Sequence, residues 1–271
     1  TPLLKQFYPT SVLVTGYDII FFWVARMLIM GMEFMQDIPF EKVFIHGLVR
    51  DSQGRKMSKS LGNGIDPLEV IDKYGADTLR FMLITGNTPG NDMRFYWERV
   101  EATRNFANKI WNASRFVLMN VSEMKLTKPN VADLSVADKF IRSKMKKAIA
   151  DVTASINAFR FDQVANTIYE FIWNEYCDWY LEFTKAILKS DKATAEQKNA
   201  TAYTLVEVLE AVMRLVHPVM PFLTQTIWLQ TAPMIGKLNE QKTIINAAFP
   251  QESDFDEDKK AEADINFIKD V

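Results

Sequence analysis

The sequence predicts a mainly α-helical chain in which a short α/β region precedes a helix bundle. Strand-like and helical apolar patterns alternate over residues 1–93. From about Arg94 onward, apolar residues recur at helical spacing in long segments separated by polar, proline-containing linkers. Strand, helix, strand is the order of a parallel α/β layer, and long helices with short connections are typical of a bundle. At 271 residues the chain is long enough for both units.

The α/β region contains two predicted strands with a helix between them. Residues 11–15 form a short apolar, β-branched run, and residues 43–49 form a second one that ends in a polar turn at 51–54. Thr15 followed by Asp18 has the form of a capping box, and helical apolar spacing then continues through Gly31. The pattern predicts a helix that starts where the first strand ends.

Two short helices follow the turn and lead into the predicted bundle. Pro67 suits a first helical turn, Gly75 ends that helix, and residues 76–84 form a second short helix. Four longer helical segments are predicted at 94–121, 135–158, 161–189 and 196–230. Pro218 and Pro221 interrupt the last of them. The acidic stretch after Gln251 is predicted to be weakly structured, although its apolar residues can dock, namely Ile265, Phe267 and Ile268.

Bulk composition excludes several classes of protein. A net charge of −2 argues against a basic, nucleic-acid-binding surface over the whole protein, so any RNA contact has to come from local patches. The single cysteine, Cys177, excludes an intramolecular disulfide and suits the cytoplasm, and its aromatic surroundings favour a buried inert thiol. No segment has the length of a membrane span, and the sequence pattern leads us to expect no secretory signal. The chain starts at Thr1 without a methionine, so we expect a piece of a longer protein.

The histidines indicate neither a metal site nor acid–base chemistry. His46 and His217 are the only two, and no His/Cys cluster has zinc spacing, so no protein-bound metal is predicted. We expect His217 to pack in an apolar helix end and His46 to be structural or to lie beside a nucleotide.

The run Arg55–Asn63 is the feature richest in chemistry. It places three cations within five residues, next to two hydroxyls and a glycine. Lysine ammonium groups and an arginine fork can give a polyphosphate several hydrogen-bond donors at once. From the residues alone, an ordinary basic surface turn explains the run equally well.

A second run, Thr15–Met27, combines one acid with two large apolar residues. Ile19 and Trp23 are four residues apart and share a helix face, and Asp18 precedes them. A carboxylate for an ammonium group and hydrocarbon for a side chain suit a small aliphatic amino acid. The residues alone favour a simpler interpretation, in which Asp18 is a capping acid and both apolar residues belong to the core.

These runs together resemble the valine-specific branch of the class I aminoacyl-tRNA synthetases. Residues 55–60 look like their KMSKS signature, and residues 15–27 and 43–51 are similar to the strings that accompany it. The resemblance implies that Asp18 holds the amino group of valine, that Ile19 and Trp23 line the valine pocket, and that Lys56 and Lys59 are catalytic. It also implies an ATP site formed by Gly16, His46, Gly47, Lys56, Met57, Ser58 and Lys59.

The same resemblance implies an anticodon-binding bundle. Residues 75–80 resemble the segment with which such enzymes leave the catalytic domain, and residues 105–116 resemble part of the bundle itself. Its implied anticodon contacts are Arg94, Lys109, Arg115 and Phe116, which supply the guanidinium, ammonium and aromatic groups that read unstacked bases. Core packing is an open alternative for Phe116 and for Trp111. The basic run Arg142, Lys144, Lys146 and Lys147 is predicted to be a solvated face.

The resemblance divides the chain into four parts. Residues 1–66 correspond to the C-terminal part of a Rossmann-like catalytic domain, 67–93 to a connector, and 94–250 to the anticodon-binding bundle. Residues 251–271 form an acidic tail that leads toward a coiled-coil arm outside the chain. The N-terminal half of the nucleotide fold and the editing domain are also expected to lie outside it, so the chain alone should not activate valine.

The implied parent enzyme is a ligase that joins valine to its tRNA in two steps, through valyl-adenylate. Its partners are valine, valine tRNA and ATP with Mg²⁺ as substrate; we expect a monomer without membrane contact. Two alternatives stay open. One is a self-standing tRNA-binding module. The other is an isoleucine-specific relative, in which a polar residue replaces Ile19.

Overall fold

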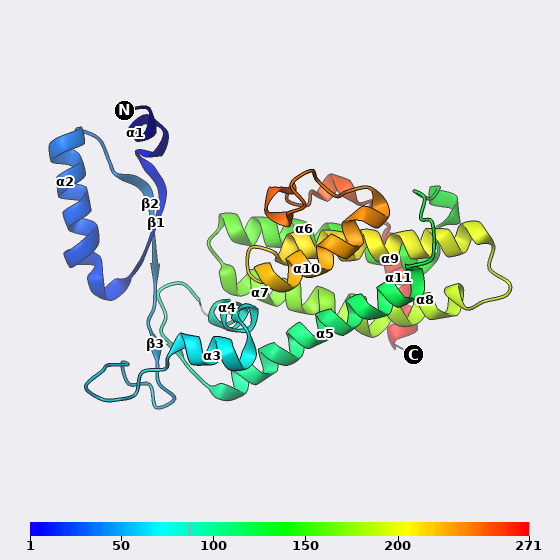
Figure 1. Cartoon of the computed structure of the whole chain (residues 1–271), viewed down its shortest axis with the longest axis horizontal. Coiled ribbons are helices and arrows are strands. Elements are labelled where there is room, and N and C mark those ends of the chain that lie inside the picture. Colours follow the sequence, from blue (N-terminus) through cyan, green and yellow to red (C-terminus); the bar gives the residue numbers. More distant parts are fainter. Residues whose placement is uncertain (87, 271) are drawn as a thin grey trace.

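The computed structural model describes residues 1–86 and 88–270. Its N-terminal unit stands beside the rest of the molecule, at the left of Figure 1. The unit consists of α1 (Pro2–Phe7), β1 (Thr10–Gly16), α2 (Ala25–Met35) and β2 (Phe40–His46). The two strands pair in parallel, with Thr10 opposite Phe40 and Gly16 opposite His46. The predicted strand–helix–strand order is therefore confirmed.

A second small unit connects the strands to the bundle. Its short strands β3 (Val49–Arg50) and β4 (Met93–Arg94) pair in parallel, and α3 (Pro67–Tyr74) and α4 (Ala76–Ile84) lie between them in sequence. The Asp66 side chain caps α3, and Gly75 separates the two helices at a φ of 89°, which a residue with a side chain rarely adopts. Seven buried residues give this unit its own small core: Val70, Tyr74, Leu79, Met82, Met93, Phe95 and Val100.

The bundle matches the predicted segments closely. Its helices are α5 (Trp97–Val121), α6 (Val136–Asn157), α7 (Phe161–Glu170), α8 (Leu181–Leu188), α9 (Ala195–Val216) and α10 (Pro221–Thr231). Capping boxes at Ser135 and Thr194 start α6 and α9. Between α7 and α8 the chain stays helical but widens into a π-helix, η4 (Phe171–Tyr180). The described chain also has short turns at η1 (Tyr17–Ile19), η2 (Ile20–Val24), η3 (Val131–Asp133), η5 (Ala232–Ile235), η6 (Ile244–Asn246) and η7 (Glu252–Asp254).

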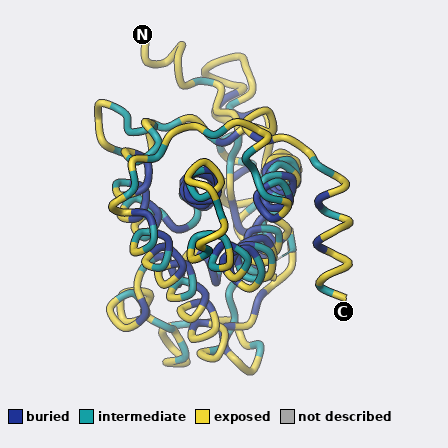
Figure 2. Tube along the Cα trace, turned by 90° about the vertical axis from the view of Figure 1, so that its right-hand side faces the viewer, coloured by how far each residue is buried: buried dark blue, intermediate teal, exposed yellow. Residues whose placement is uncertain are grey.

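The bundle core is centred on α9, where every residue from Ala200 to Val216 is buried. Buried positions are dense through the helices of Figure 2 and sparse near the N-terminus at its top. The carboxylates of Asp138 and Glu210 are almost completely buried within this core. Asp138 accepts hydrogen bonds from Tyr180 (2.7 Å) and Thr201 (2.8 Å), and Glu210 accepts from Arg214 (2.8 Å) and the Trp228 indole (2.9 Å).

The acidic tail is ordered and packs on the bundle, so the expectation of weak structure was wrong. It contains α11 (Lys259–Asp270), whose Ala261 and Ile265 join the bundle core together with the preceding Phe255. Phe267 and Ile268 instead face solvent. Ion pairs connect α11 to the bundle: Lys269 pairs with Glu175, and Lys144 with Glu262 at 3.4 Å.

The prediction of a solvated basic face is consequently wrong for two of its four residues. The side chains of Arg142 and Lys144 are only 13% and 20% exposed. Arg142 pairs with Glu207 on α9, and its guanidinium lies over the Phe255 ring. These cations attach the tail to the bundle because acidic residues of α9 and the tail face them.

Helix α4 attaches the N-terminal units to the bundle. The Asp77 carboxylate accepts hydrogen bonds from the backbone N–H groups of Phe222 (3.2 Å) and Leu223 (2.6 Å) at the start of α10. One turn later, the Arg80 guanidinium donates to the carbonyls of Pro218 and Val219, both at 2.9 Å. The segment 75–80, singled out by its sequence, therefore contains the residues that hold the turn between α9 and α10.

Candidate functional site

The loop from Asp51 to Asn63 is organised by one carboxylate. Asp51 accepts hydrogen bonds from the backbone N–H of Arg55 (2.8 Å), from its guanidinium (2.7 Å) and from the Asn63 amide (2.9 Å). The amide oxygen of Asn63 in turn accepts from the Ser58 N–H at 3.0 Å. The hydrogen bonds from Asn63 and Arg55 lower the pKa of Asp51 to about 2. Asp51 and Asn63 thus hold the two ends of the basic run together.

The three cations of the run have different surroundings. The Arg55 guanidinium forms an ion pair with Asp51, so it stabilises the loop itself. The Lys56 ammonium lies 3.1 Å from a carboxylate oxygen of Asp18. Lys59 is exposed and has no ion-pair partner in the described part of the chain. Lys59 is therefore available to an anionic ligand as it stands, whereas Lys56 becomes available only if Asp18 releases it.

Asp18 does not form the predicted capping box. Thr15 lies at the end of β1, is buried, and donates its hydroxyl hydrogen to the carbonyl of Gly16. The Asp18 carboxylate instead lies over Gly16, where an added Cβ would come within 2.9 Å of its oxygen. The predicted ammonium-binding acid and the predicted phosphate-binding lysine, 38 residues apart, consequently contact each other.

The ends of the two parallel strands bring the remaining predicted nucleotide residues together. Gly16 and His46 are opposite each other in the register, and the His46 ring lies within hydrogen-bond distance of the Gly47 carbonyl (2.7 Å). Gly47 has no room for a side chain, because a Cβ would lie 1.9 Å from the carbonyl oxygen of Asn91. The absence of a side chain at Gly47 is thus required by the neighbouring loop.

Asp92 is an organising residue that the sequence did not indicate. It accepts hydrogen bonds from the Leu48 N–H (2.7 Å) and the Tyr17 hydroxyl (3.1 Å), and it pairs with Arg50. The hydrogen bond from Leu48 contributes most to lowering its pKa. Asp92 therefore joins β3 to the turn that carries Asp18.

The two predicted pocket residues are accessible. Ile19 is 42% and Trp23 is 52% exposed, so the interpretation that they are ordinary core residues is wrong. They also do not share a regular α-helix face, since a 3₁₀ turn at 17–19 is followed by a π turn at 20–24. The neighbouring Phe21 and Phe22 are exposed as well.

The predicted RNA-binding residues divide into two places. Lys109, Arg115 and Phe116 lie on α5, whereas Arg94 lies on β4 with its guanidinium against Gly54. Arg115 is 18 residues beyond the first residue of α5, which corresponds to about 27 Å along the axis. The structure therefore does not bring Arg94 together with the other three.

The three residues on α5 also differ among themselves. Lys109 donates to Asp178 (2.8 Å), which raises the pKa of Lys109, and its ammonium lies over the Trp173 ring. Phe116 packs partly on the bundle core with Lys185 over its ring, while Arg115 is exposed. Trp111 is 43% exposed, so core packing does not account for it.

Two other residues confirm their predicted structural roles. Cys177 is buried, and burial raises the pKa of its thiol to about 12, as expected for an inert group. His217 lies within hydrogen-bond distance of the Thr224 hydroxyl (2.8 Å), and burial lowers its pKa.

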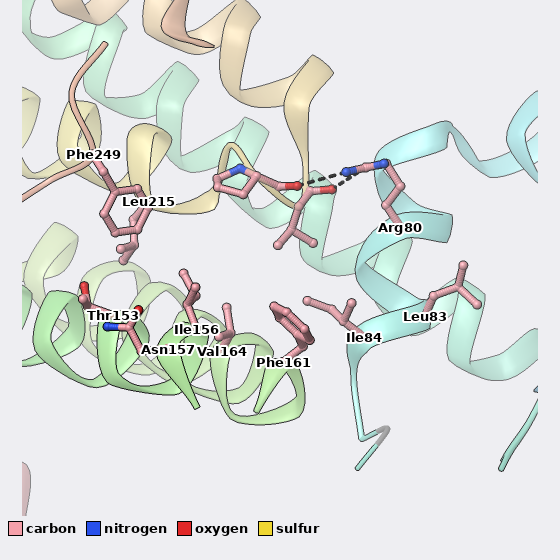
Figure 3. A pocket seen from close by; sticks show the side chains of 12 residues that line it. Arg80, Leu83, Ile84, Thr153, Ile156, Asn157, Phe161, Val164, Leu215 and Phe249 are labelled. Atoms are coloured by element: carbon pink, nitrogen blue, oxygen red, sulfur yellow. Dashed lines mark hydrogen bonds between the residues drawn. The ribbon is translucent and has the colours of Figure 1, made fainter. Parts of the chain in front are cut away.

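An apolar cavity of about 700 Å³ lies between α4 and the bundle (Figure 3). Ile84, Phe161, Leu215 and Phe249 contribute to its walls, and Arg80 lies at one side. The Arg80 guanidinium is already bound to two carbonyls, as the dashed lines in Figure 3 indicate. The cavity is therefore best understood as a seam between the connector and the bundle.

The described residues contain neither a candidate metal site nor a candidate membrane-spanning helix. No group of three or more His, Cys, Asp or Glu side chains within residues 1–86 and 88–270 is arranged to hold a metal ion. No helix in that part of the chain has both the length and the hydropathy needed to cross a membrane.

Comparison with known proteins places this arrangement in a family. A family model described as tRNA synthetases class I (I, L, M and V) matches residues 1–96, and one described as the anticodon-binding domain of tRNA ligase matches residues 138–271. The chain is 53% identical over 249 residues to the valine–tRNA ligase of Clostridium tetani. The chain belongs to the class I aminoacyl-tRNA synthetases.

Further relatives agree with this family assignment. The valine–tRNA ligase of Halalkalibacterium halodurans is 50% identical over 271 residues, which is 100% of this chain and 30% of that protein. The Clostridium match covers 92% of this chain and 27% of its relative. The chain thus spans less than a third of the length of these two curated class I synthetases.

Solved structures of class I synthetases share the fold. The LeuRS of Agrobacterium radiobacter K84, in a ternary complex with tRNA and LeuAMS, superimposes with a TM-score of 0.71 at 21% identity, covering 94% of this chain and 30% of that one. The methionyl-tRNA synthetase of Mycobacterium tuberculosis in complex with methionyl-adenylate gives 0.70 at 25% identity, covering 84% and 45%. A class I catalytic part followed by a helical bundle therefore describes the architecture.

Proposed function

We propose that this chain is the part of a valine–tRNA ligase that completes the valine and ATP site and carries the anticodon-binding helices. The observation that carries the proposal is the 3.1 Å contact between Lys56 and Asp18. The contact joins the acid that we propose to hold an ammonium group to the loop that we propose to bind phosphate, and it lies at the carboxyl ends of two parallel strands, where α/β proteins bind ligands. The names and the identity of 49–53% of the relatives support valine as the substrate.

In the first proposed step, a carboxylate oxygen of valine attacks the α-phosphorus of ATP, and the bond to pyrophosphate breaks. Asp18 holds the valine ammonium group, while Ile19 and Trp23 contact the isopropyl group. Lys56 and Lys59 stabilise the charge that develops on the leaving pyrophosphate, which Mg²⁺ accompanies as part of the ATP substrate. The step needs positioning and charge neutralisation rather than a general base.

This proposal gives the Lys56–Asp18 pair a defined role. The valine ammonium displaces the lysine from the carboxylate, and Lys56 turns toward the triphosphate. Both side chains are accessible enough for such an exchange, at 62% and 30% exposed. Gly16, His46, Gly47, Met57 and Ser58 are proposed to contact the nucleotide.

In the second proposed step, a ribose hydroxyl of the terminal adenosine attacks the acyl carbon of valyl-adenylate, and AMP leaves. Lys109, Arg115 and Phe116 are proposed to contact the anticodon region, and Arg94 to contact the same RNA nearer the lysine loop. The proposed compartment is the cytoplasm, and the proposed assembly is a monomer.

A chimeric enzyme tests the catalytic proposal. This chain replaces its aligned segment in the Halalkalibacterium halodurans ligase, and valine-dependent ATP–pyrophosphate exchange is measured. We expect exchange with valine, a loss of about 10²–10³ in kcat for Lys59→Ala, and a higher KM for valine in Asp18→Asn. Exchange that is unaffected by either substitution would contradict the assigned roles.

The same chimera separates valine from isoleucine. We expect the unmodified chimera to prefer valine and Ile19→Gln to shift the preference toward isoleucine. An apolar pocket rejects threonine only about 10²-fold, so correction of that error requires residues outside this chain. The chain alone is expected to show no exchange, and measurable exchange would refute that expectation.

A further inference from the structure

One exposed stripe on α5 lies outside the residues matched by either family model, which end at 96 and resume at 138. Arg104, Asn108, Trp111 and Arg115 are all exposed and follow one another at intervals of four, three and four residues. Such spacing places them on a single helix face. They extend over about 16 Å of the helix axis. We call these four residues the α5 stripe.

The polar groups of the α5 stripe have no partner among the residues that the structure describes. None of its four side chains forms an ion pair or a side-chain hydrogen bond within residues 1–86 and 88–270. Lys109, which lies on the adjacent face of the same helix, is paired with Asp178. Glu101, which precedes Arg104 by about one helical turn, accepts a hydrogen bond from the Tyr74 hydroxyl at 3.2 Å. The stripe therefore presents two unneutralised guanidinium groups and an amide to solvent.

Trp111 also borders a groove between α5 and α10. The groove has a volume of about 560 Å³ and is lined on the α10 side by Phe222, which is 66% exposed. Asp77 lies at its floor, with both carboxylate oxygens bound to backbone N–H groups at the start of α10. A phosphate in the groove would meet this carboxylate, whereas a flat uncharged ring would meet two aromatic side chains.

We propose that the α5 stripe and Phe222 bind RNA, with one unstacked base in the groove against Trp111 and with phosphates on Arg104 and Arg115. The charge of the stripe favours a polyanion, and the aromatic groove favours a base. The stripe is continuous with Arg115, so the inference rests on the proposed function and extends its RNA contact toward the connector. The Asn108 amide, one turn from Trp111, is placed to reach a base edge or ribose hydroxyl.

Binding of a fluorescently labelled valine tRNA transcript to the 271-residue chain tests this proposal, by anisotropy at several salt concentrations. Trp111→Leu should weaken binding about tenfold, and Trp111→Tyr, which keeps a ring, should retain most of the affinity. Arg104→Gln should lower the slope of log affinity against log salt by about 1. Matched controls are Phe267→Leu, an exposed aromatic residue on α11, and Lys147→Gln, an exposed cation on α6.

The outcomes separate this inference from the proposed function. An anticodon-changed transcript measures anticodon reading, which the proposed function requires. If the unmodified chain prefers the valine anticodon and neither stripe variant weakens binding, the stripe contacts something other than RNA and the inference is wrong alone. If the unmodified chain binds both transcripts equally and the stripe variants weaken that binding, the inference stands and anticodon reading by the chain fails. No binding by the unmodified chain overturns both, and a circular dichroism melt confirms that each variant is folded.

Discussion

The N-terminal α/β unit and the helix bundle bury their apolar residues to very different extents. On α2, Ile29 is 67% and Phe34 is 75% exposed, whereas α9 buries every residue from Ala200 to Val216. Parallel strands are normally covered on both faces, whereas in the pair β1–β2 the side chains of Val14 and Val43 are 60% and 37% exposed. The comparison teaches that stability resides in the bundle, while the proposed chemistry resides in the unit with the weaker core.

Removing the buried carboxylate of α6 should give the largest loss of stability. Asp138→Ala leaves the Tyr180 and Thr201 hydroxyls without their acceptor in a dry core, which should cost about 3–4 kcal/mol. Urea unfolding followed by circular dichroism measures this. The control, Asp191→Ala at an exposed linker position, should change stability by less than about 0.5 kcal/mol. Equal effects would show that the bundle does not depend on its buried polar network.

An identical substitution in the two regions sharpens the comparison. Ile149→Ala on α6 removes a side chain that is 1% exposed and should cost about 3 kcal/mol. Ile29→Ala on α2 removes one that is 67% exposed and should cost about 0.5 kcal/mol or less. The measurement is the urea unfolding of both variants. A comparable loss at Ile29 would mean that α2 is covered by other parts of the chain in solution.

The lysine loop should depend on Asp51 rather than on apolar burial. Asp51→Asn weakens the attachment of Arg55 and Asn63, so tryptic cleavage after Lys56 and Lys59 should accelerate about tenfold, which corresponds to ~1.4 kcal/mol of local opening. Asp72→Asn, an exposed acid on α3, serves as the control. Unchanged cleavage would show that the loop is held by something else.

The loop should also respond to pH in one direction. The pKa of Asp51 is lowered to about 2 in the folded chain, against about 3.9 for a free aspartate. Its contribution is therefore complete above about pH 4 and is lost as the pH falls toward 2. The amide NMR signal of Arg55 should shift over that interval. A midpoint near 4 would indicate that Asp51 is not bound in solution.

The last prediction concerns the contact between the two regions. Phe44 on β2 stacks on Phe159 at 5.6 Å between ring centroids and meets Phe161 edge-on at 5.5 Å. Phe44→Leu keeps an apolar group but removes both aromatic pairs, which should cost about 1 kcal/mol. Differential scanning calorimetry should show the early part of the transition moving down while the bundle transition stays in place. A downward shift of the bundle transition would contradict this separation.

Local signals in the sequence predicted most of the fold. Pro67 and Gly75 act within one helical turn, so their effects are visible without knowledge of the tertiary structure. The capping box predicted at Thr15 failed because Thr15 continues β1 and is buried there. Here tertiary packing overrode a local preference.

The parts that could not be predicted depend on contacts distant in sequence. Asp92 binds Leu48 and Arg50 across more than 40 residues, and neither hydrophobic periodicity nor a local motif predicts such a contact. The acidic tail was misjudged for the same reason, since its order comes from Phe255 and from Glu262 pairing with Lys144 on α6. For the candidate site, the sequence allowed us to predict which residues and which loop are involved. It did not allow us to predict the contact between Lys56 and Asp18.

The length of helix α5 determines how far the stripe lies from β4 and in which direction it points. It begins next to β4, beside the lysine loop, and carries the stripe toward the bundle (Figure 1). Each residue added to a helix lengthens it by about 1.5 Å and turns its far end by about 100°. One residue inserted before Arg104 would therefore turn the stripe by about 100° relative to β4, while seven would nearly restore its direction about 10 Å farther away. A change in the length of α5 would therefore keep the direction of the stripe only in steps that are close to whole turns.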